Sequence, residues 1–257
     1  MHRLLVQTEL LNDGDVRLPP DALRHLKVVR PKPGELVELF DGAGRIRRYS
    51  VEPSGVGARE PLLSAAGEIE SFPPPPFSLT LFACVTKGSR WDWTIEKATE
   101  LGVTRIVPVL SERCIVRIAA EERAAKRARW RRIAEDAARQ SDARWLPEVR
   151  EAVDFGDSLA LAKECVCFAG ALTDPPPEPL VLAIERCMAE RGEAKSFGLF
   201  VGPEGDFTPG ELEALLEVAV PASFGPTILR AETAAIFGVS VLAAELCRRC
   251  GFRDDLV

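Results

Sequence analysis

Two short stretches near the C-terminal end contain residues whose types and spacing could hold a ligand. They are LFVGPEGDF (Leu199 to Phe207) and FGPTILRAETAAIFG (Phe224 to Gly238). Each is an apolar run followed by a loop with Gly and Pro and by the start of a helix. The first turn of a helix leaves backbone N–H groups unpaired at the positive end of the helix dipole, which suits an anion or a polar cofactor edge. The two loops predict one shared pocket; two tight turns with capping carboxylates are the alternative.

Fingerprints of several other sites are absent from the sequence. It has no G-x-x-x-x-G-K-[ST] phosphate loop and no G-x-G-x-x-G between a strand and a helix. Both histidines, His2 and His25, lie near the N-terminus, so a Ser–His–Asp triad, a Cys–His pair and an H-E-x-x-H zinc site are not indicated. Cys165-x-Cys167 and Cys247-x-x-Cys250 could suggest zinc. Without nearby histidines, however, the seven cysteines are more typical of free thiols, and we expect no metal.

Charge is distributed unevenly along the 257 residues. The net charge is −6, yet residues 87–150 carry 15 Lys and Arg against 10 Asp and Glu, whereas residues 151–257 carry 8 against 18. A local basic excess is enough to contact the phosphates of a nucleic acid; a solvated helix face with ion pairs is the alternative. We expect a cytoplasmic protein, because the N-terminus turns polar at once and no apolar run approaches the ~20 residues of a membrane span.

The elements that must position the two loops follow from the pattern upstream. Residues 1 to about 70 are rich in strand patterns, with two strands expected around a turn at Asp41-Gly42-Ala43-Gly44 and a short helix over 22–30. The proline run SFPPPPF (71–77) favours an extended segment and a domain boundary.

Beyond the boundary, strand and helix patterns alternate, which is typical of an α/β domain with a parallel sheet. Thr208-Pro209-Gly210-Glu211 has the composition of a helix N-terminus directly after the GPEG loop. Open α/β sheets bind ligands at this carboxyl end of their strands. The second proline-rich segment, DPPPEP (174–179), is expected to be a surface linker. The strands are expected at 77–85, 104–110, 164–170 and 197–202, and the helices at 90–102 and 119–141.

The order of several short motifs resembles the SPOUT superfamily of knotted RNA methyltransferases. Within it, the chain is similar to the family that methylates N3 of a uridine in 16S ribosomal RNA of the small subunit. The resemblance covers nearly the whole chain, and the number of motifs in order makes it specific. Its motifs are HLKVVR (25–30), LFDG (39–42), Lys87 with EKATELGV (96–103), PVLSERCIVR (108–117), WRRIAEDA (130–137), QS (140–141), PEV (147–149), GPEG (202–205) and ILRAETAA (228–235).

The resemblance implies an α/β fold with a C-terminal SPOUT methyltransferase domain. This domain would contain a parallel sheet and a trefoil knot, and a small β-rich PUA-like domain would precede it. The implied ranges are 1–70 for a PUA-like RNA-binding domain, 71–76 for a Pro-rich linker and 77–257 for the methyltransferase domain. It also implies S-adenosyl-L-methionine as methyl donor, a homodimer, and 16S rRNA in the small ribosomal subunit as partner. The family usually has a second glycine where this chain has Asp206.

The expected site residues fall into three groups, of which the cofactor contacts carry over from the resemblance onto matching positions. Arg230 is the expected stabiliser of negative charge on the uracil, and Glu232 is the weaker candidate for the base, with a helix cap as its alternative. The expected cofactor contacts are Leu172, Phe200, Val201, Gly202, Pro203, Glu204, Gly205, Phe224, Gly225, Ile228, Leu229 and Arg230. The expected RNA contacts are Arg24, Lys27, Arg30, Arg113, Arg117, Arg139 and Gln140. Two alternative functions stay open: another SPOUT RNA methyltransferase with a tRNA or ribose target, and a non-catalytic RNA-binding assembly factor.

Overall fold

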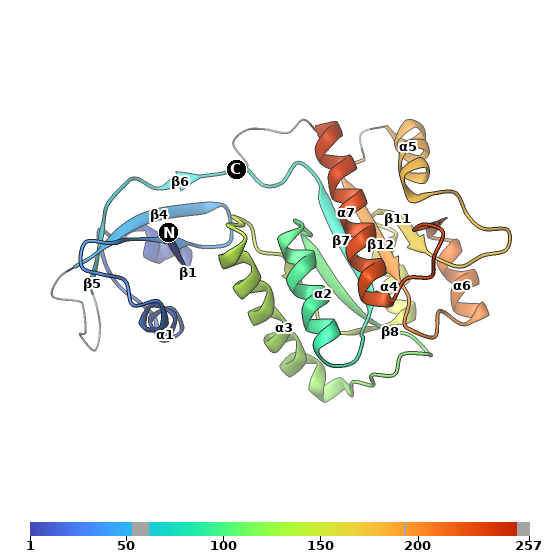
Figure 1. Cartoon of the computed structure of the whole chain (residues 1–257), viewed down its shortest axis with the longest axis horizontal. Coiled ribbons are helices and arrows are strands. Elements are labelled where there is room, and N and C mark those ends of the chain that lie inside the picture. The colour runs from blue at the N-terminus through green and yellow to red at the C-terminus, as the bar shows by residue number, and fades with distance from the viewer. Residues whose placement is uncertain (53–61, 193, 251–257) are drawn as a thin grey trace. The chain divides into compact units, whose positions relative to one another are not determined.

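A computed structural model describes residues 1–52, 62–192 and 194–250 (Figure 1). The chain divides into two compact units. The first contains Met1–Pro75 and Glu135–Leu146, and the second contains Pro76–Ala134 and Pro147–Val257. The division falls inside the long helix α3 (Ala120–Gln140). Residues 135–146 therefore group with the first unit, whereas the expected ranges 1–70, 71–76 and 77–257 divide the chain consecutively.

The first unit is built on a six-stranded sheet. Its order is β1 (His2–Leu5), β3 (Leu36–Phe40), β4 (Arg45–Val51), β5 (Leu62–Ala65) and β2 (Asp15–Arg17), with β6 (Glu70–Ser71) paired to β4. A 3-10 helix, η1 (Thr8–Asn12), and the helix α1 (Pro20–Val29) complete the unit.

The expected hairpin at residues 41–44 of the first unit is confirmed. The strands β3 and β4 are antiparallel, and Asp41 Oδ1 accepts hydrogen bonds from the N–H groups of Ala43 and Arg45 at 2.8 and 3.0 Å. Gly42 and Gly44 have positive φ angles of 69° and 88°, which glycine adopts without steric cost. The turn residues thus set the strand pairing.

Within the second unit, the expected parallel sheet is present, and every pairing in it is parallel. The strand order is β10 (Val153–Asp154), β8 (Arg105–Leu110), β7 (Ser78–Cys84), β12 (Ser196–Val201), β11 (Val166–Gly170) and β13 (Ala219–Ala222), with β9 (Glu148–Val149) paired to β8. β13 has no counterpart among the expected strands, because Pro221 interrupts its short pattern. Proline is tolerated here because β13 lies at the edge of the sheet.

Helices cover both faces of this sheet. α2 (Ser89–Glu100), α3, α5 (Leu180–Arg191) and α7 (Ala231–Cys250) contribute to one apolar layer, and α4 (Phe155–Ala162) and α6 (Pro209–Leu216) to the other. Along β7, Leu79 and Leu81 face the first layer, whereas Phe82 and Cys84 face the second. This alternation is the two-residue period of a strand buried on both faces. α7 packs on α2, α5, β7 and β12, and Figure 1 shows α2 and α7 side by side over the sheet.

The expected start of α6 is also confirmed. Glu211 N donates to Thr208 Oγ1 at 3.3 Å, and Thr208 N donates to Glu211 Oε2 at 3.0 Å, which is a complete capping box with Pro209 in the first turn. This cap fixes where the loop after β12 ends. No helix in the described part of the chain is both long and apolar enough to cross a membrane.

Candidate functional site

The carboxyl ends of three neighbouring strands form the wall of a cavity in the second unit. β11, β12 and β13 are adjacent and parallel, so the loops that follow them emerge at the same sheet edge. The cavity has a volume of about 480 Å³, within the range of small-molecule sites. Its lining residues are Gly170, Ala171, Leu172, Thr173, Pro176, Pro177, Val201, Gly202, Pro203, Glu204, Asp206, Ala222, Ser223, Phe224, Gly225, Thr227, Ile228, Leu229, Arg230, Ala231 and Ala234.

The loop after β12 is a tight turn closed by its own backbone. Asp206 N donates to Pro203 O at 3.0 Å. Asp206 has a φ of 59°, a left-handed conformation that glycine adopts freely and that aspartate tolerates better than most residues. Its Oδ1 accepts a hydrogen bond from Phe207 N at 2.8 Å. Asp206 therefore fills a position where the resemblance suggests glycine, and the turn is retained.

The loop after β13 is anchored by an aromatic ring. The ring centroids of Phe224 and Phe237 are 5.8 Å apart. The Phe224 ring also lies so close to Gly170 that a Cβ atom on this glycine would overlap the ring. A Cβ on Gly238 of α7 would also approach this ring, at 3.1 Å. Gly225, with a φ of 123°, then turns the chain toward α7. Two glycines thus make room for the ring, and a third lets the backbone turn at the cavity wall.

Apolar side chains at the cavity are unusually exposed. Leu172 is 62% exposed and Ile228 is 83% exposed, although both line the cavity. Large apolar side chains exposed in a concave site are typical of a surface that contacts a ligand.

Charged residues besides Asp206 lie at or next to the cavity. Arg230 lines it, and within the described ranges no carboxylate lies at ion-pair distance from its guanidinium. Glu204 lines it as well, with Oε1 3.2 Å from Arg90 Nη1. Glu232 is not a lining residue; its Oε1 lies 3.9 Å from Arg90 Nε, and its Oε2 is buried without a hydrogen-bond partner.

The structure brings together ten of the twelve residues expected to contact a cofactor. The exceptions are Phe200, whose ring stacks on Phe82 at 4.5 Å inside the core, and Gly205. The Gly205 carbonyl accepts a hydrogen bond from Arg113 Nη1 at 3.0 Å. The ten lining residues are Leu172, Val201, Gly202, Pro203, Glu204, Phe224, Gly225, Ile228, Leu229 and Arg230.

Two of the arginines expected to contact RNA bind backbone carbonyls in the second unit. Arg113 donates to Gly205 O and, at 3.2 Å, to Phe207 O, so it braces the loop after β12. Arg117 donates to Ser111 O at 3.3 Å and to Glu112 O at 2.6 Å. These bonds hold both guanidinium groups in the fold and leave fewer donors for a phosphate.

The other five expected RNA contacts belong to the first unit. Four are exposed: Arg24, Lys27, Arg30 and Gln140. Arg139 is half-buried, pairs with Asp136, and has an Nε that is buried without a partner. Burial lowers the pKa of the Arg139 guanidinium from its ordinary value.

Some lining residues were not among the expected site residues. The segment 174–179 was expected to be a surface linker, but Pro176 and Pro177 line the cavity, because the chain leaves β11 beside the ends of β12 and β13. The sequence signal that could have placed this segment at the site is the end of a buried strand at Gly170. Arg90 was missed because nothing in its local sequence indicates two carboxylate partners more than 100 residues away.

Comparisons with known proteins bear on what this cavity holds. A sequence profile described as an RNA methyltransferase domain matches residues 73–243. The chain is 30% identical over 247 residues to "Ribosomal RNA small subunit methyltransferase E" of Synechocystis sp., covering 95% of this chain and 78% of that protein. The protein of the same name from Mycobacterium tuberculosis is 32% identical over 224 residues, covering 87% and 81%.

Solved structures of the same fold contain a ligand. A Legionella pneumophila protein described as a methyltransferase, in complex with the bound cofactor SAM, has a TM-score of 0.81 at 28% identity, covering 95% of this chain and 97% of that chain. A ribosomal RNA small subunit methyltransferase E from Neisseria gonorrhoeae, bound to S-adenosyl methionine, has a TM-score of 0.81 at 27% identity, covering 95% and 98%.

Proposed function

The chain belongs to the RNA methyltransferase domain family, and we propose that it transfers a methyl group from S-adenosylmethionine to N3 of a uridine in 16S rRNA of the small ribosomal subunit. The observation that carries the proposal is the cavity at the ends of β11, β12 and β13. The relatives that share the fold over 95% of this chain include two solved with this methyl donor.

The residues present fit S-adenosylmethionine. Leu172, Phe224, Ile228 and Leu229 offer an apolar wall for an adenine ring. The loops after β12 and β13 present backbone groups for polar edges, and Glu204 supplies negative charge. When bound, S-adenosylmethionine supplies an electrophilic methyl group on a positively charged sulfur.

The chain's own residues have to orient the uracil and manage its charge. N3 of uracil carries a proton near neutral pH, and removing it places negative charge on O2 and O4. Arg230, which lines the cavity without a carboxylate partner in the described ranges, is available to stabilise that charge. Alignment of N3 with the methyl group supplies a further part of the rate enhancement.

Glu232 is the candidate for the general base. A general base has to come within about 3 Å of the proton that it removes, directly or through one water. Glu232 is turned toward Arg90 in this structure, and one of its oxygens is buried. Its role as base therefore stays a prediction that requires the side chain to turn toward the cavity.

We further propose a knotted second unit, an RNA-binding N-terminal domain and a homodimer. The loops at 202–208 and 223–230, with α7 returning from the edge strand β13 to pack on β12, β7 and α2, favour the trefoil knot of a SPOUT domain.

The exposed cations on α1 favour a PUA-like RNA-binding role for residues 1–70, with 71–76 as linker. Trp93 on α2 and Phe237 on α7, 40% and 41% exposed, favour a homodimer that covers these helices. A ribosomal substrate favours a location in the cytoplasm.

A methyl-transfer assay tests the proposed function. The purified chain is incubated with S-adenosylmethionine carrying a labelled methyl group in three separate reactions. These reactions contain isolated small subunits, free 16S rRNA or tRNA. Label is expected in the 16S rRNA of the first or second substrate, on N3 of a uridine. Label only in tRNA or on ribose would replace the substrate assignment, and no label on any RNA would favour a non-catalytic RNA-binding protein.

A further inference from the structure

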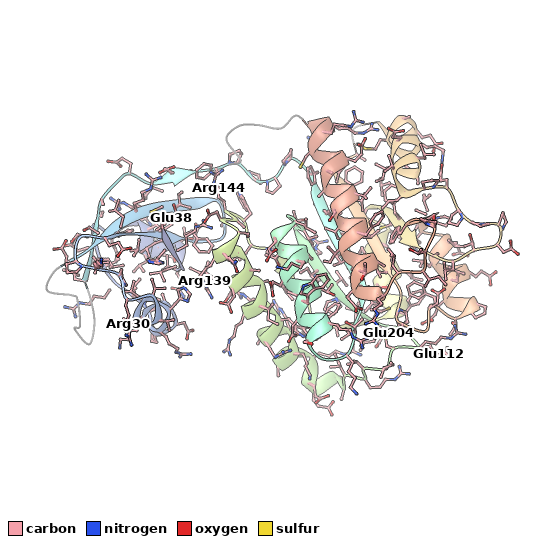
Figure 2. All side chains as sticks on the ribbon, in the orientation of Figure 1. Arg30, Glu38, Glu112, Arg139, Arg144 and Glu204 are labelled. Atoms are coloured by element: carbon pink, nitrogen blue, oxygen red, sulfur yellow. The ribbon has the colours of Figure 1, made fainter. Side chains whose placement is uncertain are left out.

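A single arginine joins three segments of the second unit beside the cavity. Arg90 lies in the first turn of α2, Glu204 in the loop after β12, and Glu232 in the first turn of α7. Arg90 Nη1 is 3.2 Å from Glu204 Oε1, and Arg90 Nε is 3.9 Å from Glu232 Oε1. Figure 2 labels Glu204 beside the start of α7. The guanidinium therefore bridges two carboxylates that are 28 residues apart in the chain.

The charges in this cluster do not cancel. Two carboxylates share one guanidinium, whose five N–H donors can serve both. The Glu204 and Glu232 side chains are only 27% and 12% exposed, so water screens their mutual repulsion less than at an open surface. Removal of the arginine would leave two partly buried carboxylates without the cation that they share.

The second oxygen of Glu232 makes the arrangement depend further on Arg90. Oε2 is buried and has no hydrogen-bond partner among the described residues. A buried carboxylate with one oxygen unpartnered is costly, and within the described ranges the ion-pair partner of the other oxygen is Arg90. Loss of Arg90 would thus drive Glu232 toward solvent and disturb the neighbouring Glu204.

We propose that Arg90 is a positioning residue of the methyl-donor site. It is not a lining residue of the cavity, whereas its partner Glu204 is. Arg90 acts through Glu204: it holds the loop after β12 against the starts of α2 and α7, in the shape that binds the donor. This inference rests on the proposed function, since it names how the same site is kept in shape.

Titration calorimetry with S-adenosylmethionine tests this role without any assay of activity. The Arg90→Ala variant is expected to bind the donor about 10-fold more weakly, a coupling typical of residues in one charge network. Arg90→Lys, which keeps the cation but loses the fork, is expected to lie between it and the unmodified protein. Arg90→Ala combined with Glu232→Gln removes the repulsion and is expected to recover affinity to within about threefold.

Arg105 provides a matched control. It also bridges two carboxylates, with Nε 2.9 Å from Glu148 Oε2 and Nη1 3.9 Å from Glu164 Oε2. Arg105 is the first residue of β8, so it lies at the amino-terminal end of the parallel strands, whereas the cavity lies at their carboxyl ends. Arg105→Ala is expected to leave the donor affinity unchanged, and thermal melting without donor checks that each variant is folded.

The outcomes separate this inference from the proposed function. If the unmodified protein binds no S-adenosylmethionine, the proposed function fails. If the unmodified protein binds it and Arg90→Ala, folded, binds equally well, Arg90 has no positioning role. If Arg90→Ala binds weakly and the added Glu232→Gln recovers nothing, the bridge between the two carboxylates is overturned.

Discussion

At the scale of single residues, the cavity depends on a few side chains that allow its loops to turn sharply. Asp206 adopts a left-handed conformation and caps the next N–H group, and Gly170 leaves room for Phe224. Arg230 is the exposed cation of the cavity wall. These residues divide into those that shape the site and one that is available to contact a substrate.

Replacement of Asp206 tests the role of the left-handed turn. Asp206→Ala loses the hydrogen bond to Phe207 N and places a less tolerant residue at φ 59°, so the free energy of unfolding should fall by about 1–2 kcal/mol. Asp206→Gly also loses the hydrogen bond but relieves the backbone strain, and its loss should be smaller. Urea denaturation measures both values. Equal stability of the Ala and unmodified proteins would contradict this explanation.

Replacement of Arg230 tests its role in catalysis. Arg230→Ala removes the cation that stabilises developing negative charge, so kcat should fall about 100-fold, as for loss of one preorganised donor. The Kd for S-adenosylmethionine should rise by a smaller factor, because the apolar wall and the loop backbones stay in place. Arg105→Ala is the control at the opposite sheet edge. A kcat for Arg230→Ala within threefold of the unmodified enzyme would be inconsistent with the assignment.

At the scale of elements, a helix cap and an ion-pair cluster provide local contacts in the helices around the site. The capping box of α6 fixes the end of the loop after β12. Near the C-terminal end of α7, the Glu245 carboxylate pairs with the guanidinium groups of Arg248 and Arg249 at 2.6 and 2.7 Å. Both sets of contacts are local in sequence, and both are measurable by single substitutions.

Removal of the α6 cap should destabilise the second unit. Thr208→Ala loses the hydroxyl that accepts from Glu211 N, and the expected loss in unfolding free energy is about 1 kcal/mol. Glu213→Ala, an exposed position on the same helix, serves as control and should change stability by less than about 0.5 kcal/mol. Urea denaturation compares the two. A Thr208→Ala loss no larger than that of the control would mean that the cap is not stabilising.

The Glu245 cluster predicts a dependence of stability on pH. The hydrogen bond from Arg248 is the main cause that lowers the pKa of Glu245 to about 2. A lowered pKa in the folded state means that the contribution is present above the unfolded value near 4.5 and is lost as the pH falls toward 2. The difference in unfolding free energy between the unmodified protein and Glu245→Gln should therefore shrink through this window. A difference that grows as the pH falls would contradict it.

At the scale of the whole molecule, sequence patterns predicted the local elements but not the contacts between residues far apart in the chain. The hairpin at 41–44 and the start of α6 follow from residues close in sequence, and both are confirmed. Segment 135–146 packs with the first unit because Arg3 donates to the carbonyls of Ala138 and Ala143, about 140 residues away. The bridge from Arg90 to Glu204 is of the same kind. The spacing of residues in the sequence does not predict such contacts, because only the completed fold brings the partners together.

The most direct test of the central claim is mass analysis of 16S rRNA from cells with and without this protein. We predict one N3-methyluridine that is present in the parent, absent in the deletion, and restored by the unmodified protein but not by Arg230→Ala. An unchanged set of methylated uridines in 16S rRNA after deletion would contradict the account.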